Sequence, residues 1–145
     1  KRGFKSEVMV NTTEPLFLDG VRNENKKVVL STVHQQFVDG IVQANIPLVH
    51  KDVELEHIEQ WLSQGFSVLL LISTYSFDGK KSPHWVCVTH LDEHCVYVHD
   101  PFCEPGSDKQ LAIDCQYVPI ARSDFSKMSA FGSQRLRTAV AIANN

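Results

Sequence analysis

The chain has 145 residues, of which 43% are hydrophobic and 21% are charged. This length and composition are typical of one soluble globular domain, so we expect residues 1–145 to form a single domain with its own core. A net charge of -3 argues against a nucleic-acid-binding surface. No apolar stretch approaches the roughly 20 residues that span a bilayer. We therefore expect no nucleic-acid partner, no membrane partner and a cytoplasmic location.

The N-terminal half predicts two helices between short strands. A strand at Glu7–Val10 comes first, and apolar residues at helical spacing then predict an amphipathic helix from about Asn25 to Ala44. The segment Ile46–Val49 is expected to be a short edge strand, because its Pro47 cannot donate a hydrogen bond to a central strand. Asp52 is expected to cap a second helix that ends at Gly65.

The C-terminal half predicts a sheet. Val68–Ile72 is apolar at every position, which indicates a central strand covered on both faces. The strand Pro83–His90 begins a hairpin, and a short third helix is expected between a cap at Ser123 and Gly132. Arg137–Ala143 predicts the last strand. These elements predict an α+β domain with an antiparallel sheet and helices packed against it.

His84 and Asp100 lie at adjacent ends of the two hairpin strands and are the candidate catalytic residues. In cysteine catalysis a thiolate attacks, an imidazole accepts and returns a proton, and a carboxylate orients the imidazole ring. A bulge or an odd connection near Asp92–His94 would place both residues on the face of the strand valines. A two-residue turn would place them on opposite faces. The hypothesis therefore includes a prediction of register.

The cysteines at positions 87, 95, 103 and 115 are expected to be reduced and structural, as in a cytosolic protein. None has the setting of a nucleophile, and Cys103, three residues beyond Asp100, is the least implausible substitute. A metal site is the alternative chemistry, because histidines and cysteines crowd the hairpin. However, strand alternation scatters them over two faces and no Cys-x-x-Cys pair occurs. We expect no metal and no cofactor.

Several different short motifs are spread over nearly the whole chain. They are Phe17-Leu18-Asp19-Gly20-Val21-Arg22, Leu71-Ile72-Ser73-Thr74-Tyr75, Asp78-Gly79-Lys80-Lys81, Pro83-His84-Trp85-Val86, His99-Asp100-Pro101, Asp114-Cys115-Gln116, Pro119-Ile120 and Arg135-Leu136-Arg137. As a set they resemble the papain-like peptidases related to the bacteriocin-leader-processing (double-glycine) peptidase domain of ABC exporters. The similarity is greatest to a stand-alone bacterial branch of that family.

The resemblance implies a papain-like cysteine peptidase fold, with His84 as general base and Asp100 as its orienting partner. In such proteins the nucleophilic cysteine begins a helix in an N-terminal segment, a few residues after a glutamine that helps bind the oxyanion. Neither has a counterpart here, and Lys1–Phe4 resembles the end of that helical region. The resemblance thus implies that the N-terminal helical part of the fold is missing and that the chain alone is inactive.

Two functions of different classes follow. The first is a cysteine peptidase that acts on a peptide or protein substrate, with this chain as the C-terminal part of its domain. The second is a papain-like domain without catalysis that binds a peptide or protein partner in the same cleft. A missing helix would expose an apolar groove beside His84, where we expect self-association or a bound peptide.

Overall fold

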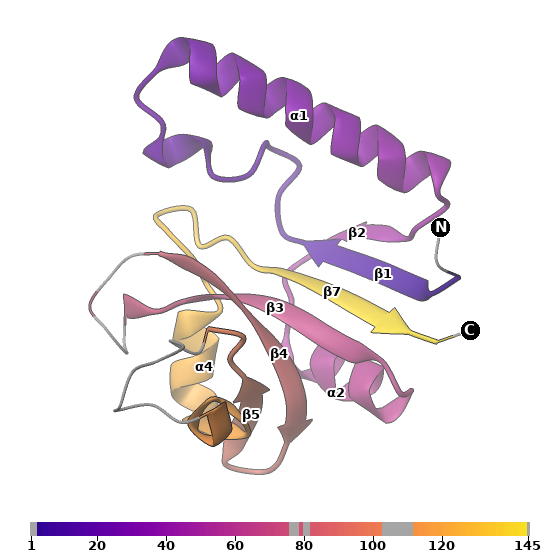
Figure 1. The fold of residues 1–145 in the computed structure, drawn as a ribbon, viewed down its shortest axis with the longest axis vertical. Helices are drawn as coiled ribbons and strands as arrows, with labels where there is room; N and C mark the ends of the chain where they lie inside the picture. Colours follow the sequence, from indigo (N-terminus) through magenta and orange to yellow (C-terminus); the bar gives the residue numbers. More distant parts are fainter. Residues whose placement is uncertain (1–2, 76–78, 80–81, 103–111, 145) are drawn as a thin grey trace.

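A seven-stranded sheet runs through the computed structural model, which describes residues 3–75, 79, 82–102 and 112–144. The strand order is β2-β1-β7-β3-β4-β5-β6 (Figure 1). The strands are β1 (Lys5–Val10), β2 (Leu48–His50), β3 (Ser67–Ser73), β4 (Pro83–Leu91), β5 (Cys95–His99), β6 (Val118–Ala121) and β7 (Thr138–Ala143). Strands β1 and β2 are parallel, and the other neighbouring strands are antiparallel. The sheet is therefore mixed, whereas the sequence predicted an antiparallel sheet.

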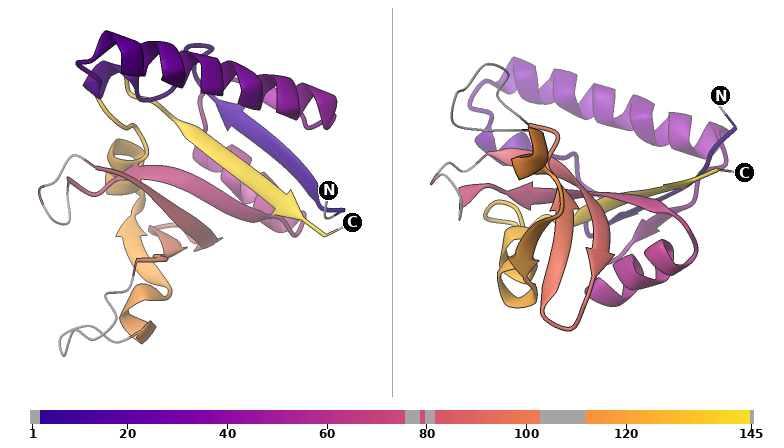
Figure 2. Two further views of the ribbon diagram at one scale, coloured as in Figure 1. Left: turned by 45° about the horizontal axis from the view of Figure 1, so that its top comes forward. Right: turned by 60° about the horizontal axis from the view of Figure 1, so that its bottom comes forward.

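The described helices lie on both sides of this sheet. They are α1 (Glu24–Gln43), α2 (Leu55–Ser63) and α4 (Arg122–Met128), with short 3-10 helices η1 (Leu18–Gly20) and η2 (Ala112–Cys115). Figure 2 shows α2 and α4 on one face of the sheet and α1 on the other. The described residues thus form an α+β fold, as predicted. None of their helices is long and apolar enough to cross a membrane.

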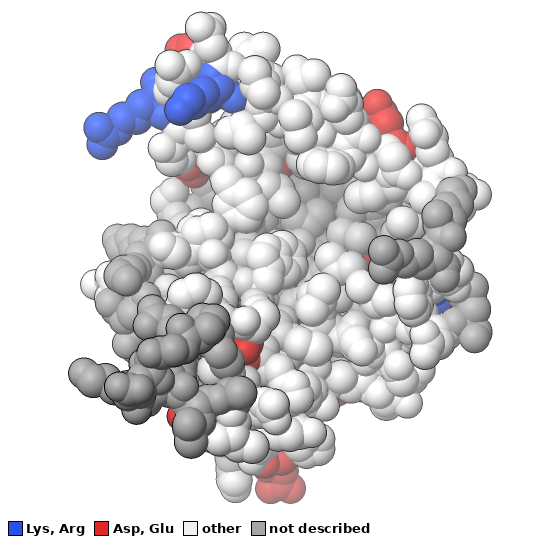
Figure 3. Space-filling view, viewed as in Figure 1, with Lys and Arg blue, Asp and Glu red and all other residues white. Residues whose placement is uncertain are grey.

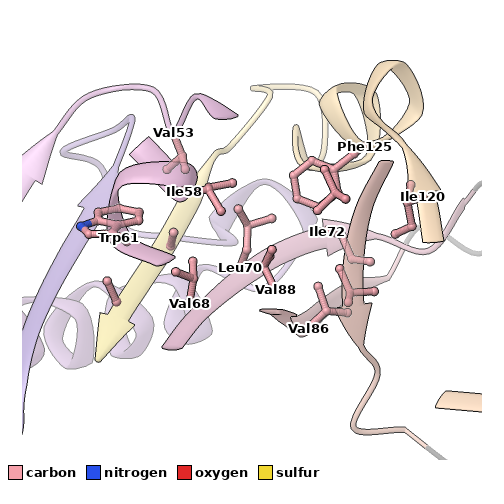
Figure 4. Packing of buried hydrophobic residues seen from close by; sticks show 14 of the residues in the cluster. Val53, Ile58, Trp61, Val68, Leu70, Ile72, Val86, Val88, Ile120 and Phe125 are labelled. Atoms are coloured by element: carbon pink, nitrogen blue, oxygen red, sulfur yellow. The ribbon is translucent and has the colours of Figure 1, made fainter. Parts of the chain in front are cut away.

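The main core lies between the sheet and the pair α2 and α4 (Figure 4). Alternate residues of β3 point into it, namely Val68, Leu70 and Ile72, all at most 1% exposed. They meet Ile58 of α2 and Phe125 of α4 in the same cluster. This packing confirms that β3 is a central strand.

The second face of the sheet is covered less completely. Leu71 is buried there in a smaller cluster with Val10 and Leu136, but Leu69 is 37% and Trp85 38% exposed. Figure 3 shows a hollow in the molecular surface between α1 and the sheet. The expectation that Val68–Ile72 is covered on both faces is therefore wrong at Leu69, because helices cover the second face of the sheet less completely.

Helix α1 occupies the range that its periodicity predicts, but none of its residues is buried. Its side chains Val29 and Phe37 are 60% and 69% exposed. With Leu30 and Val33 they form one apolar stripe, since these positions recur at helical spacing. We call these four residues the α1 stripe.

Three predicted helix ends need correction. Glu54, not Asp52, is the N-cap of α2, where it forms a capping box with His57. The Asp52 carboxylate instead accepts a 2.8 Å hydrogen bond from the Asn11 amide. Ser123 lies inside α4, which begins after Ala121 and ends at Met128. The sequence signals were correct to within a few residues, but Asp52 bonds to Asn11 instead of to the start of α2, where Glu54 and His57 cap each other.

The cysteines also differ from the prediction. Cys87 and Cys95 are free, whereas Cys115 is disulfide-bonded to a partner outside the described residues. The expectation that all four are reduced is therefore wrong for Cys115. Disulfides are usual in oxidising compartments, so a cytoplasmic location stays a prediction. The motif residues Asp78, Lys80 and Lys81 and the weak nucleophile candidate Cys103 also lie outside the described residues.

Candidate functional site

The register of the β4–β5 hairpin decides which side chains share a face. Cys87 pairs with His99 and Val88 with Val98, but the register then shifts, so that His90 pairs with Tyr97. The shift is a bulge at Thr89, which lies before the turn and not within it. The predicted bulge is therefore confirmed, although its place is several residues earlier.

The bulge brings the strand valines and the two polar residues to one face. The buried valines are Val86, Val88, Val96 and Val98, each at most 2% exposed. His84 and Asp100 lie at the end of this apolar patch, with side chains 21% and 30% exposed. His84 and Asp100 therefore contact buried valines on one side and solvent on the other, so that a substrate can reach them.

His84 and Asp100 are in direct contact. The His84 Nε2 and Asp100 Oδ1 atoms are 2.7 Å apart, which is a short hydrogen bond. Asp100 Oδ1 also accepts a 2.8 Å hydrogen bond from the backbone N–H of Phe102. The backbone N–H of Asp100 in turn donates to the carbonyl of Cys115 at 2.8 Å. Asp100 is thus held through both its main chain and its side chain.

The bond to Asp100 determines what the imidazole can do. With its proton on Nε2 toward the carboxylate, a neutral His84 has its acceptor at Nδ1. Within the described part of the chain, Nδ1 has no hydrogen-bond partner. Nδ1 can therefore accept a proton from a nucleophile placed beside it, while the carboxylate stabilises the imidazolium that results.

No described cysteine is placed to be that nucleophile. Cys87 lies three residues from His84 and on the opposite face of β4, and burial raises the pKa of its thiol, which disfavours the thiolate. Cys95 lies at the turn end of β5, and Cys115 is in a disulfide. The weak alternative, Cys103, lies outside the described residues.

The histidines near the hairpin do not converge on a metal. His90 packs against the ring of Tyr97, with ring centroids 5.6 Å apart, and His99 packs edge-on against Tyr117 at 4.5 Å. No group of three or more His, Cys, Asp or Glu side chains that could hold a metal ion occurs among the residues that the structure describes. In this part of the chain the geometry thus gives no support to the alternative of a metal centre.

Asp92 fixes the turn at the other end of the hairpin. Its Oδ1 atom accepts hydrogen bonds from the backbone N–H groups of His94 and Cys95, at 2.8 and 2.7 Å. Its Oδ2 atom accepts one from the Tyr97 hydroxyl at 2.8 Å. These bonds lower the pKa of Asp92 to about 2, and the same contact raises the pKa of Tyr97. The turn is therefore held by a carboxylate that stays ionised at neutral pH.

A cavity of about 780 Å³ lies beside the start of β4, where Pro83 forms part of its wall. The rest of the wall comes from the segments 11–20 and 131–136, which lie side by side in Figure 1 although they are far apart in sequence. No sequence pattern predicted this cavity. The only sequence signals near it were the motifs at positions 17–22 and 135–137, which carried the family resemblance and no prediction of a pocket.

The α+β fold of the described residues is consistent with the peptidase class that these motifs resemble. The chain belongs to the Peptidase_C39 like family, whose model matches residues 1–143. Searches of curated proteins and of solved structures find no significant match. The family match covers nearly the whole chain but assigns no role to His84 or Asp100.

Proposed function

We propose that this chain supplies the general base and the orienting carboxylate of a papain-like cysteine peptidase. His84 is the base, Asp100 orients it, and the nucleophilic cysteine comes from outside these 145 residues. The observation that carries the proposal is the 2.7 Å bond between His84 Nε2 and Asp100, which leaves Nδ1 as the acceptor. A chance surface histidine has no reason to be fixed in this way by an aspartate whose carboxylate accepts from the Phe102 N–H and whose own backbone N–H donates to the Cys115 carbonyl.

The proposed reaction follows from this geometry. His84 Nδ1 takes the proton of the cysteine thiol, and the thiolate attacks the carbonyl carbon of a peptide bond. The C–N bond then breaks, the imidazolium returns its proton to the departing amine, and an acyl-thioester remains. Water attacks the thioester with His84 again as base, which releases the acid and restores the thiol. Without the cysteine the first step fails, so we expect the chain alone to be inactive.

The second candidate is a non-catalytic domain of the same fold that binds a peptide or protein. The observation in its favour is that no described thiol lies beside His84, while a cavity of about 780 Å³ lies at the same end of β4 on the opposite face of the strand. Self-association through an apolar groove beside His84 stays a prediction, and the exposed α1 stripe is a further apolar surface through which we propose that two copies associate. Both candidates place the ligand at the same end of β4.

The extended chain, in which the residues encoded before Lys1 are restored, distinguishes the two candidates. For a peptidase, mass spectrometry after iodoacetamide treatment should find a new thiol that is alkylated about tenfold or more faster than Cys87 and Cys95. His84→Ala should abolish this excess rate, whereas the matched control His90→Ala, an exposed histidine of the same strand, should leave it unchanged. If no thiol depends on His84, the peptidase assignment fails and the binding domain remains.

A further inference from the structure

Cys115 is in contact with Asp100, the residue that orients His84. It belongs to the short helix η2 and is 3% exposed. Its carbonyl oxygen accepts a hydrogen bond from the backbone N–H of Asp100 at 2.8 Å. Its Sγ atom lies 3.8 Å from the carbonyl oxygen of Phe102, whose own N–H donates to the Asp100 carboxylate. Cys115 therefore contacts both Asp100 and the residue that holds the Asp100 side chain.

The bond between Asp100 and Cys115 lies beyond the end of the β5–β6 ladder. The last pair of that ladder is Val98 with Val118, and β6 is the last strand in the order of the sheet. Between Cys115 and Val118, Tyr117 has φ of 51°, so the chain leaves the extended conformation there. Strand pairing therefore ends before Asp100, and the position of Asp100 depends on how firmly Cys115 itself is held.

Cys115 is held by a disulfide bond. Among the described residues Cys87 and Cys95 are free, whereas Cys115 is bonded to a partner outside these residues. A disulfide keeps the Cα atoms of its two cysteines about 4.4–6.8 Å apart. This covalent limit acts on η2, which lies outside the sheet. Without the bond, the carbonyl of Cys115 can move away from the Asp100 N–H.

We propose that the disulfide of Cys115 positions Asp100, and through Asp100 keeps the imidazole of His84 fixed as the base. Cys115 contacts no reacting atom of the proposed reaction, so it is a positioning residue and not a catalytic one. Its effect on catalysis rests on the proposed function, but its effect on Asp100 can be measured without any reaction. A dithiol such as dithiothreitol breaks the S–S bond: it supplies two electrons and two protons, two cysteine thiols form, and the reagent becomes a cyclic disulfide. This reduction should loosen the contact between His84 and Asp100.

Backbone order parameters from NMR relaxation of the isotope-labelled 145-residue chain test the proposal, because they report motion within the folded state and not its stability. In the wild type, Asp100 and Phe102 should have the values of rigid backbone, about 0.85, and in Cys115→Ala these should fall to about 0.6 or below. Leu70 of the central strand β3 should keep a value of about 0.85 in both chains. The ring nitrogen signals of His84 should shift together with the loss of order at Asp100.

The matched control is Cys95→Ala, which removes a free cysteine of β5 and should leave the order parameter of Asp100 unchanged. Dithiothreitol should lower the order parameters of the wild type as Cys115→Ala does, once mass spectrometry has confirmed that the bond is broken, and reoxidation should restore them. The reagent thus gives the same test if the variant does not fold, whereas a folded Cys115→Ala should be indifferent to it. An order parameter at Asp100 that stays unchanged after loss of the disulfide would overturn the proposal.

Alkylation of the extended chain shows whether Cys115 acts through Asp100. Cys115→Ala should slow the His84-dependent alkylation by about two- to fivefold, which is no more than the loss expected when the charge of Asp100 itself is removed. The double variant with Asp100→Asn should then react at the rate of Asp100→Asn alone. A loss equal to the product of the two single losses would refute this route, because independent effects multiply.

Failure of this inference and failure of the proposed function give different results. If Asp100 loses order without the disulfide but alkylation does not depend on His84, the positioning of Asp100 stands and the peptidase assignment fails. If alkylation depends on His84 but Asp100 keeps its order, the peptidase stands and the role of the disulfide is refuted.

Discussion

Asp100→Asn isolates the charge of the orienting group, because asparagine keeps the shape of aspartate. Asp100 Oδ1 accepts two hydrogen bonds, from His84 Nε2 and from the Phe102 N–H, at 2.7 and 2.8 Å. Hydrogen bonds to a charged group contribute about 1.5–3 kcal/mol, and neutral ones about 0.5–1.5 kcal/mol. Loss of the charge therefore removes about 1 kcal/mol per bond. Only the bond to His84 acts on the imidazole, and both side chains are partly exposed, so the loss that affects the thiol is about 1 kcal/mol.

This energy predicts the loss of reactivity. Because about 1.4 kcal/mol corresponds to a factor of ten in rate, Asp100→Asn should slow alkylation of the reactive thiol in the extended chain by about fivefold. Iodoacetamide labelling followed by mass spectrometry at neutral pH measures it. Asp39→Asn is the matched control, since the Asp39 carboxylate lies on exposed α1 and its bond is to Gln35. An Asp100→Asn rate equal to wild type, with His84→Ala still slow, would refute the orienting role.

Three further predictions concern stability and assembly. Because the pKa of Asp92 is lowered to about 2, its stabilisation of the hairpin is fully present above about pH 4 and is lost as the pH falls toward 2. Asp92→Asn should therefore lower the unfolding temperature at neutral pH and reduce its fall as the pH drops toward 2. An unfolding temperature that depends on pH as in the wild type would contradict the role of Asp92 in the turn. Phe125→Ala leaves a cavity where a side chain that is 1% exposed had packed, and should lower the free energy of unfolding in urea by about 3–5 kcal/mol. Phe37→Ala should lower it by less than about 0.5 kcal/mol, because Phe37 is exposed. Phe37→Asp puts a charge in the α1 stripe and should abolish self-association in sedimentation velocity; a wild-type chain that is monomeric at all concentrations contradicts that use of the stripe.

Local patterns were enough to predict the elements around the site. Strand alternation placed His84 with the valines of β4, and helical periodicity placed α1 within one residue at each end. The bulge could be predicted because only one of the two registers buries all four valines. Its position at Thr89 could not, since alternation between the strands leaves several equivalent places for an extra residue.

Features that depend on distant segments were missed. The strand β6 is four residues long, contains Pro119 and follows Tyr117 at a positive φ, so it carries little strand signal of its own. The parallel pairing of β1 with β2 comes from a connection through the whole of α1. The cavity joins Asp19 to Ser133 across 114 positions of sequence, which no local pattern can show.

The tautomer of His84 shows whether this residue can act as the base, and it can be measured on the 145-residue chain without a nucleophile or substrate. Long-range nitrogen–proton NMR correlations of the imidazole ring distinguish a proton on Nε2 from one on Nδ1. We expect neutral His84 to carry its proton on Nε2, toward Asp100, with Nδ1 as the acceptor. We also expect Asp100→Asn to change the tautomer of His84 but not that of His90, an exposed histidine of the same strand. A neutral His84 with its proton on Nδ1 would contradict its role as the base.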